Sequence, residues 1–204
     1  MTTKSAGNFQ PLSLSMLQPG TGFSRPYFYC PNPVQISSSA IEVMTDLRYV
    51  PAETTHVEVK VATASQKMIA RGVRLLLVVD AYDNVVGLIT ARDLEGDRVN
   101  AASATHGVAV GDLTVGQIIT RDVEVLPLDA VLHAHVGDIL ATLKNSGRQH
   151  ALVVDQEPFT NKPMIRGVFS ASQIGRQLGI VSEPQDLSHT FEQIDKAISK
   201  LHLG

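Results

Sequence analysis

The chain has 204 residues, of which 44% are hydrophobic and 18% charged, a balance that excludes a disordered chain and suffices for one large domain or two small ones. Its net charge of −3 excludes a global basic field, so we expect no binding to nucleic acid or to a membrane. The single cysteine, Cys30, cannot form an internal disulfide, and no apolar run is long enough for a signal peptide or a membrane span. We therefore expect a cytoplasmic protein.

The sequence repeats itself. A shift of 75 positions places Gly72 on Gly147 and LVVD at 77–80 on LVVD at 152–155. Past this point the shift grows to 80, because five extra residues fall in the loop-like stretch QEPFTNKPM. Neither repeat would bury a core comfortably alone, so the two should pack together. The predicted segments are a proline-rich irregular arm over 1–40, repeats over 41–100 and 115–181, a connector over 101–114 and an amphipathic helix over 182–204.

Each repeat is predicted to contain a short strand, a helix, two strands and a second helix. In the first repeat a helix runs from about Val61 to Arg71, with Met68 and Ile69 inside and Gly72 as its end. The run LLLVVD is nearly continuous in apolar residues, which is typical of a strand buried on both faces. The fold class is therefore α/β, with two tandem β-α-β-β-α repeats packed as a pseudo-twofold pair.

The second repeat shows a matching helix that Asp129 can cap and Gly147 ends. Its apolar stripe is Leu132, Val136, Ile139, Leu140 and Leu143. A further stripe near the C-terminus has helical spacing: Leu187, Phe191, Ile194, Ile198 and Leu201. Packing of that helix against its own domain is favoured over a dimer seam, because two heptads are too few to predict a coiled coil.

The segments VVGLITARD at 85–93 and IRGVFSASQ at 165–173 share one outline, with Asp93 replaced by Gln173. One interpretation is helix capping: Thr90 and Asp93 form something close to a capping box, and Ser170 with Gln173 fits equally well. The other is ligand binding, because a carboxylate beside a helix start can accept hydrogen bonds from two sugar hydroxyls at once. Glutamine offers one uncharged acceptor and cannot do the same.

The duplicated motifs resemble a pair of cystathionine β-synthase (CBS) domains, the Bateman module. They are VMT at 43–45, GVRLLLVVDAYDNVVG at 72–87 and LITARDL at 88–94 in the first repeat, and IIT at 118–120, GRQHALVVD at 147–155 and RGVFSAS at 166–172 in the second. The resemblance covers the chain from about Val43 to Gly179. It implies a non-catalytic sensor that binds AMP, ADP, ATP or S-adenosylmethionine in clefts between the repeats, needs no other cofactor, forms a homodimer and acts on an unknown protein effector.

The resemblance also implies roles for single residues. Thr90 and Asp93 would hold the ribose, and backbone around Thr45 to Pro51 would contact the adenine. The cations that could meet phosphates are Arg92, Arg74, Arg148 and His150. Because Gln173 replaces the acid that the motif expects, the site of Ser170 and Gln173 is predicted to be degenerate, and binding is expected mainly through the first repeat.

Other functions stay open. The main alternative is a structural homodimerisation or scaffold protein with unoccupied clefts, in which Asp93 serves helix capping alone. A weaker alternative is an enzyme, although no catalytic arrangement has a supporting motif. No metal site is expected, because His133 and His135 lie two positions apart and point in nearly opposite directions on a helix.

Overall fold

The computed structural model describes residue 16 and residues 34–180 and 191–196. Residues 34–180 and 191–196 belong to one compact unit of the chain. Apart from residue 16, the predicted arm as far as residue 33 lies outside the described residues, and so do Leu187, Ile198 and Leu201.

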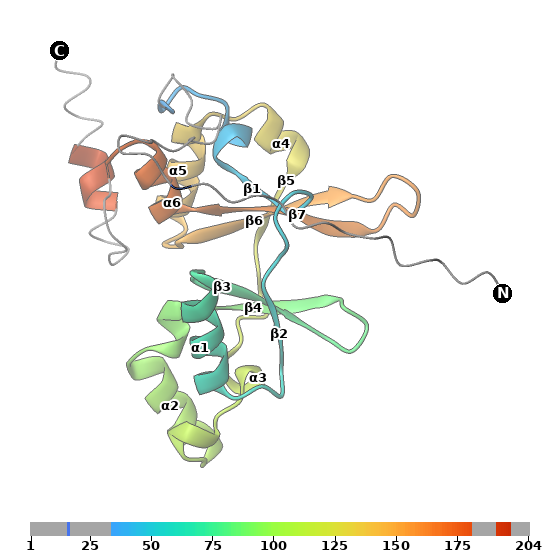
Figure 1. The fold of residues 1–204 in the computed structure, drawn as a ribbon, viewed down its shortest axis with the longest axis vertical. Coiled ribbons are helices and arrows are strands. Elements are labelled where there is room, and N and C mark those ends of the chain that lie inside the picture. Colours follow the sequence, from blue (N-terminus) through green and yellow to red (C-terminus); the bar gives the residue numbers. More distant parts are fainter. Residues whose placement is uncertain (1–15, 17–33, 181–190, 197–204) are drawn as a thin grey trace. The chain divides into compact units, whose positions relative to one another are not determined.

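The first sheet has three strands in the order β2-β3-β4, with β2 parallel to β3 and β3 antiparallel to β4 (Figure 1). These strands are β2 (Thr54–His56), β3 (Leu75–Val79) and β4 (Val85–Thr90). Its helical elements are α1 (Val61–Arg71), η2 (Ala91–Leu94), α2 (Asp97–His106), η3 (Val110–Asp112) and α3 (Val115–Ile118). Helices α1, α2 and α3 share one apolar cluster with the strands β3 and β4.

The second sheet has four strands in the order β1-β7-β6-β5 (Figure 1). These strands are β1 (Thr45–Asp46), β5 (Val125–Pro127), β6 (His150–Gln156) and β7 (Pro163–Ser170). Its helical elements are η1 (Ala40–Val43), α4 (Leu128–Leu132), α5 (Val136–Asn145) and α6 (Ala171–Gln177), and residues 191–196 are helical too. Phe191 and Ile194 are buried in the core of this sheet, so the described part of the C-terminal helix packs on its own domain as expected.

The two halves repeat each other in detail, which confirms the predicted tandem α/β fold. A register shift falls between Val78 and Val79 in one hairpin and between Val153 and Val154 in the other, 75 positions on. Gly72 and Gly147 both follow a helix with φ of +64°, a left-handed conformation that glycine adopts without steric cost. A glycine in the left-handed conformation therefore follows the end of the corresponding helix in both repeats.

The segment that leads into each repeat packs on the sheet of the other repeat. Strand β1 pairs with β7, and Val43 and Met44 are buried in the core of the second sheet. In turn, α3 is part of the core of the first sheet, and Thr120 forms a β-bridge with Leu88. The predicted boundaries at residues 41 and 115 therefore follow the sequence repeat, whereas the packing exchanges the two leading segments.

Two equivalent glycines permit this exchange. A Cβ atom on Gly87 would lie 2.5 Å from the backbone oxygen of Thr120 and 2.6 Å from Cδ1 of Ile119. A Cβ atom on Gly167 would overlap the side chain of Met44. Real Cβ atoms do not approach so closely. Glycine is therefore required at this position of the repeated motif, because the neighbouring leading segment occupies the space of a Cβ atom.

Alternating side chains of the central strands face two different cores. Leu76 and Val78 of β3 pack with the helices, whereas Leu77 packs with Leu88 and with Leu152 of β6. The two sheets thus meet through a small apolar cluster, and LLLVV is buried on both faces as predicted.

Two details of the helix predictions are wrong. The second repeat has two helices, α4 and α5, because the chain turns at Ala134, whose carbonyl accepts a bond from Ala40 N. As a result Leu132 is 53% exposed, and Asp129 lies inside α4 instead of capping it. Ile69 in α1 is 79% exposed, not internal, and its side chain lines the cavity described next.

Candidate functional site

A cavity of about 460 Å³ lies where the two repeats meet. Much of its wall is apolar and comes from α1, β3, β7 and the segments between them. The main apolar lining residues are Leu47, Met68, Ile69, Val73, Leu75 and Val168. We call this space the first cavity. Its size is typical of sites for small organic ligands.

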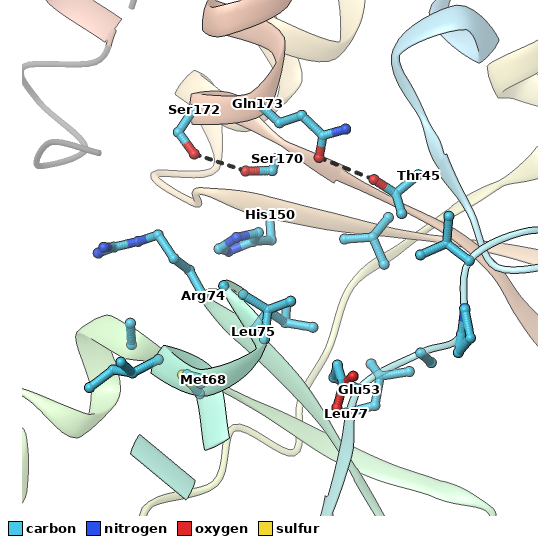
Figure 2. A pocket seen from close by; sticks show the side chains of 18 of the residues that line it. Thr45, Glu53, Met68, Arg74, Leu75, Leu77, His150, Ser170, Ser172 and Gln173 are labelled. Carbon is cyan, nitrogen blue, oxygen red and sulfur yellow. Dashed lines mark hydrogen bonds between the residues drawn. The ribbon is translucent and has the colours of Figure 1, made fainter. Parts of the chain in front are cut away.

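The polar end of the first cavity is built by β1 and α6 (Figure 2). Thr45 Oγ1 donates to Gln173 Oε1 over 3.1 Å, and the hydroxyls of Ser170 and Ser172 are 3.1 Å apart. Ser170 occupies the N-cap position of α6, yet its side chain caps no backbone amide. The predicted capping role of Ser170 with Gln173 is therefore wrong, and both side chains face the cavity instead.

The cations of the first cavity are Arg74 and Arg176, and neither has a side-chain hydrogen bond or ion pair within 34–180 and 191–196. The acid Glu53, by contrast, is held by two cations: its carboxylate lies 3.4 Å from Lys67 Nζ and 3.4 Å from Arg71 Nε. A second acid, Glu95, also lines the cavity. The cavity therefore combines two cations that have no side-chain partner among the described residues with one acid that is held by cations and a second acid, and the two cations can meet an anionic group on a ligand.

His150 stands at the first residue of β6, and Figure 2 shows it among Arg74, Leu75 and Ser170. The residue is half-buried, but its Nδ1 atom is closed off from solvent and has no hydrogen-bond partner in the described structure. The pKa of His150 is lowered from 6.5 to about 4, chiefly by burial and then by the nearby charge of Arg74, while Asp93 acts in the opposite sense. The imidazole is therefore neutral at physiological pH.

A second cavity of about 550 Å³ lies on the other side of His150. Its lining includes Thr90, Arg92, Asp93, Arg98, Thr120, Arg148 and His150. Arg148 is engaged at its edge, 3.2 Å from a carboxylate oxygen of Glu124. We call this space the second cavity.

Asp93 is satisfied by the protein itself. Its Oδ2 accepts from both the backbone N and the hydroxyl of Thr90, each over 2.8 Å, and its Oδ1 forms an ion pair with Arg98. The side chain of Thr90 in turn accepts from the backbone N of Asp93. The predicted capping box is confirmed, and Asp93 is buried, with both of its carboxylate oxygens in use.

Arg98 fastens this turn to the segment that leads into the second repeat. Its Nη2 donates to the carbonyl of Ile118 over 3.0 Å and to the hydroxyl of Thr120 over 3.2 Å. The pair of Asp93 and Arg98 therefore closes one end of the second cavity. A sugar that approached Asp93 would compete with three protein donors.

The residues predicted for the main site do not line one cavity, and two of them lie beside Ser170 and Gln173 of the predicted degenerate site. Thr90, Arg92, Asp93 and Arg148 line the second cavity, whereas Thr45, Arg74, Ser170 and Gln173 line the first; His150 lines both. The cause is the exchange of leading segments. It places Thr45 beside β7, and it places Thr120, the residue 75 positions on, beside β4.

Sequence reasoning missed Thr120, Arg98, Ser172 and Arg176 as lining residues. A signal for Thr120 was present, because the shift of 75 positions places Thr45 on it. Arg98 and Arg176 carried no signal, since each lies beyond the motif and its position depends on the course of the helix that follows.

Residues 40–95 match the family model of the CBS domain. This match covers most of the first repeat. The fold is similar to that of an uncharacterized conserved protein from Pyrococcus horikoshii, with a TM-score of 0.53 and 20% identity, covering 74% of this chain and 100% of that one. It is also similar to a CBS-domain-containing protein from Agrobacterium tumefaciens, with a TM-score of 0.50 and 18% identity, covering 66% of this chain and 93% of that one. The predicted resemblance to a tandem CBS domain pair is confirmed.

A further CBS domain pair with a TM-score of 0.48 was solved in complex with 5′-methylthioadenosine and S-adenosyl-L-methionine; it is 19% identical and covers 71% of this chain and 98% of that one. The comparison with curated proteins found no match. Among the described residues no helix is long and apolar enough to cross a membrane.

Proposed function

We propose that this CBS-domain protein is a non-catalytic regulatory module that binds an adenosine-containing ligand in the first cavity and acts on a protein effector. The observation that carries the proposal is the composition of that cavity: an apolar wall, a cluster of hydroxyl and amide groups, and two cations that have no side-chain partner within 34–180 and 191–196. An adenosine derivative combines the matching parts, namely an aromatic base, a hydroxyl-bearing sugar and, in AMP, ADP or ATP, an anionic tail.

Each part of such a ligand has a counterpart in the cavity. The base would lie against Leu75 and Val168, with backbone at Pro51 nearby. The ribose would meet Ser170 and Gln173 at the polar end. A phosphate would lie toward Arg74 and Arg176, whose guanidinium groups suit phosphate oxygens.

This assignment moves the main site away from the motif that the sequence favoured. Binding at Thr90 and Asp93 would require a ligand to replace contacts that the protein already makes. Ser170 and Gln173 make fewer internal contacts, and the cavity beside them is predominantly apolar. Displacing a well-formed charged network has a free-energy cost that filling an apolar cavity does not have.

The scaffold function remains the second candidate, and one observation favours it. Asp93 has a complete structural role in its capping box and its pair with Arg98, so its presence no longer argues for a ligand. On this alternative the protein is a homodimer whose clefts stay empty. Homodimer formation is part of both proposals, and light scattering of the full chain would test it.

The deciding experiment is thermal unfolding with AMP, ADP, ATP, S-adenosylmethionine or no addition. At 100 times its dissociation constant a ligand stabilises the folded chain by about 2.7 kcal/mol. For about 200 residues that raises the midpoint by roughly 5–11 °C. Loss of an AMP shift in Arg74→Ala and Arg176→Ala, but not in Arg92→Ala, would locate the ligand in the first cavity.

Two other outcomes would change the conclusion. Loss of the shift in Arg92→Ala alone would move the site to the second cavity. An unchanged midpoint with all four compounds would reject the sensor function and leave the scaffold function.

A further inference from the structure

We propose that His150 is a specificity-determining residue of the first cavity, which hydrogen-bonds a sugar hydroxyl of the ligand in place of the acid that the second motif lacks. The inference rests on the proposed function, and it replaces the predicted role of His150 as a cation for phosphate with that of a neutral partner for the sugar. It begins with the position of His150 in the sheet.

The register places His150 on the face of β6 that looks toward the other sheet. It pairs with Ser170 of β7, and Leu152, two residues on, belongs to the cluster between the sheets. In the first repeat the same place is held by Leu75, which pairs with Thr90. At this position an imidazole in one repeat stands where the other repeat has an apolar side chain.

The imidazole is incompletely bonded in the free protein. Nδ1 is buried and has no partner among the described residues, whereas nearly all buried polar atoms in native proteins have one. Turning the ring into the cavity breaks no hydrogen bond at Nδ1. A hydroxyl placed in the first cavity would supply the missing partner and so would bind with little opposing cost.

Gln173 cannot fill this role alone. Its only acceptor atom, Oε1, already receives the hydroxyl proton of Thr45, which leaves one lone pair for a sugar, and its amide nitrogen can only donate. A vicinal diol needs two acceptors, which an aspartate would have provided. Because the pKa of His150 is lowered to about 4, its ring is neutral and keeps one nitrogen as an acceptor at pH 7.

The test compares AMP with 2′,3′-dideoxy-AMP, which lacks the two sugar hydroxyls, by titration calorimetry at pH 7.5. Wild type should prefer AMP, and His150→Leu, which copies Leu75, should bind AMP about fivefold to tenfold more weakly, the effect of one hydrogen bond. Binding of 2′,3′-dideoxy-AMP should be the same in both. The ligand-free midpoint of His150→Leu should rise, because a buried unpaired nitrogen has been replaced by an apolar group.

Two further variants protect the result. His150→Asn keeps a polar atom near the place of Nδ1 and should retain most of the preference for AMP. His106→Leu, at the exposed end of α2, should bind both compounds as wild type does.

The failures of the two proposals are distinguishable. If His150→Leu and His150→Asn bind AMP as tightly as wild type, the inference falls and the proposed function stands. If His150→Leu loses both compounds equally, the residue supports the cavity and does not read the sugar. If wild type binds neither compound, both proposals fail.

Discussion

The turns that follow β4 and β7 have the same outline, yet their polar atoms make different contacts. In the first, Asp93 bonds to Thr90 and Arg98, and the turn is closed on itself. In the second, Gln173 reaches across to Thr45, and Ser170 bonds to a neighbouring serine. Asp93 therefore satisfies the polar atoms of the first turn within the protein. The second turn has no acid, and its polar groups face a cavity where they can bond to a ligand.

The difference teaches that a motif residue cannot be assigned to a ligand until its internal partners are known. A carboxylate near a helix start is as useful to the helix as to a sugar. In this chain the motif that better matches the family pattern is also the one whose polar atoms are already bonded within the protein. The following predictions separate the two turns and the cavities beside them.

The largest expected effect concerns His150, which has Leu75 as its counterpart. Its folded pKa of about 4 lies below the unfolded value of 6.5, so the unfolded chain takes up the proton first. The free energy of unfolding should therefore fall as pH drops from about 6.5 toward 4, by at most about 3 kcal/mol. Urea unfolding at pH 7 and pH 4.5 should show this loss in wild type and not in His150→Leu. An equal loss in both would contradict the burial of a neutral ring.

Gly87→Ala should destabilise the chain more than Gly167→Ala. The added methyl of Gly87→Ala meets backbone at Thr120, which two hydrogen bonds hold on Leu88, and this overlap should cost about 3 kcal/mol. The methyl of Gly167→Ala meets the flexible end of Met44 and should cost about 1 kcal/mol. Urea midpoints compare the two variants directly. Equal losses would mean that both leading segments yield to the same degree.

Asp93→Ala should lower the free energy of unfolding by about 2 kcal/mol, because it removes a capping box and leaves Thr90 N without an acceptor. Gln173→Ala removes one neutral hydrogen bond and should cost less than about 1 kcal/mol. Thermal unfolding of the two ligand-free variants would reveal the difference. A larger effect at Gln173 would reverse the contrast drawn between the turns.

The smallest effect on stability is expected for Gln173→Asp, which restores the acid of the motif. The carboxylate can still accept from Thr45, so the midpoint should stay within about 0.5 kcal/mol of wild type. AMP binding should become tighter, since the new group adds a second acceptor for the sugar. Titration calorimetry of wild type and variant in parallel measures this change in AMP affinity. Unchanged affinity would place the sugar away from this turn.

The sequence was sufficient for the fold because its evidence was local and duplicated. The pair of apolar runs, the glycines at 72 and 147 and the insertion in one hairpin each predicted an element that the structure contains. The break between α4 and α5 was not predictable, because it depends on a backbone bond from Ala40, far away in the chain. The grouping of site residues failed for a related reason: Thr45 serves the second repeat, and no local pattern states which sheet a short strand will join.

The exchange of leading segments has a consequence for any attempt to divide the chain. A cut in the connector would leave β1 and its apolar neighbours on the N-terminal fragment and the sheet on which they pack on the C-terminal fragment. Helix α3 would lie on the C-terminal fragment, whereas the core to which it belongs would lie on the N-terminal one. Each fragment would expose the apolar surface that a leading segment of the other fragment covers in the full chain. Mixed together, the two halves should reassemble by complementation, and kept apart they should be poorly folded. The smallest unit of this architecture that folds well is accordingly the pair of repeats.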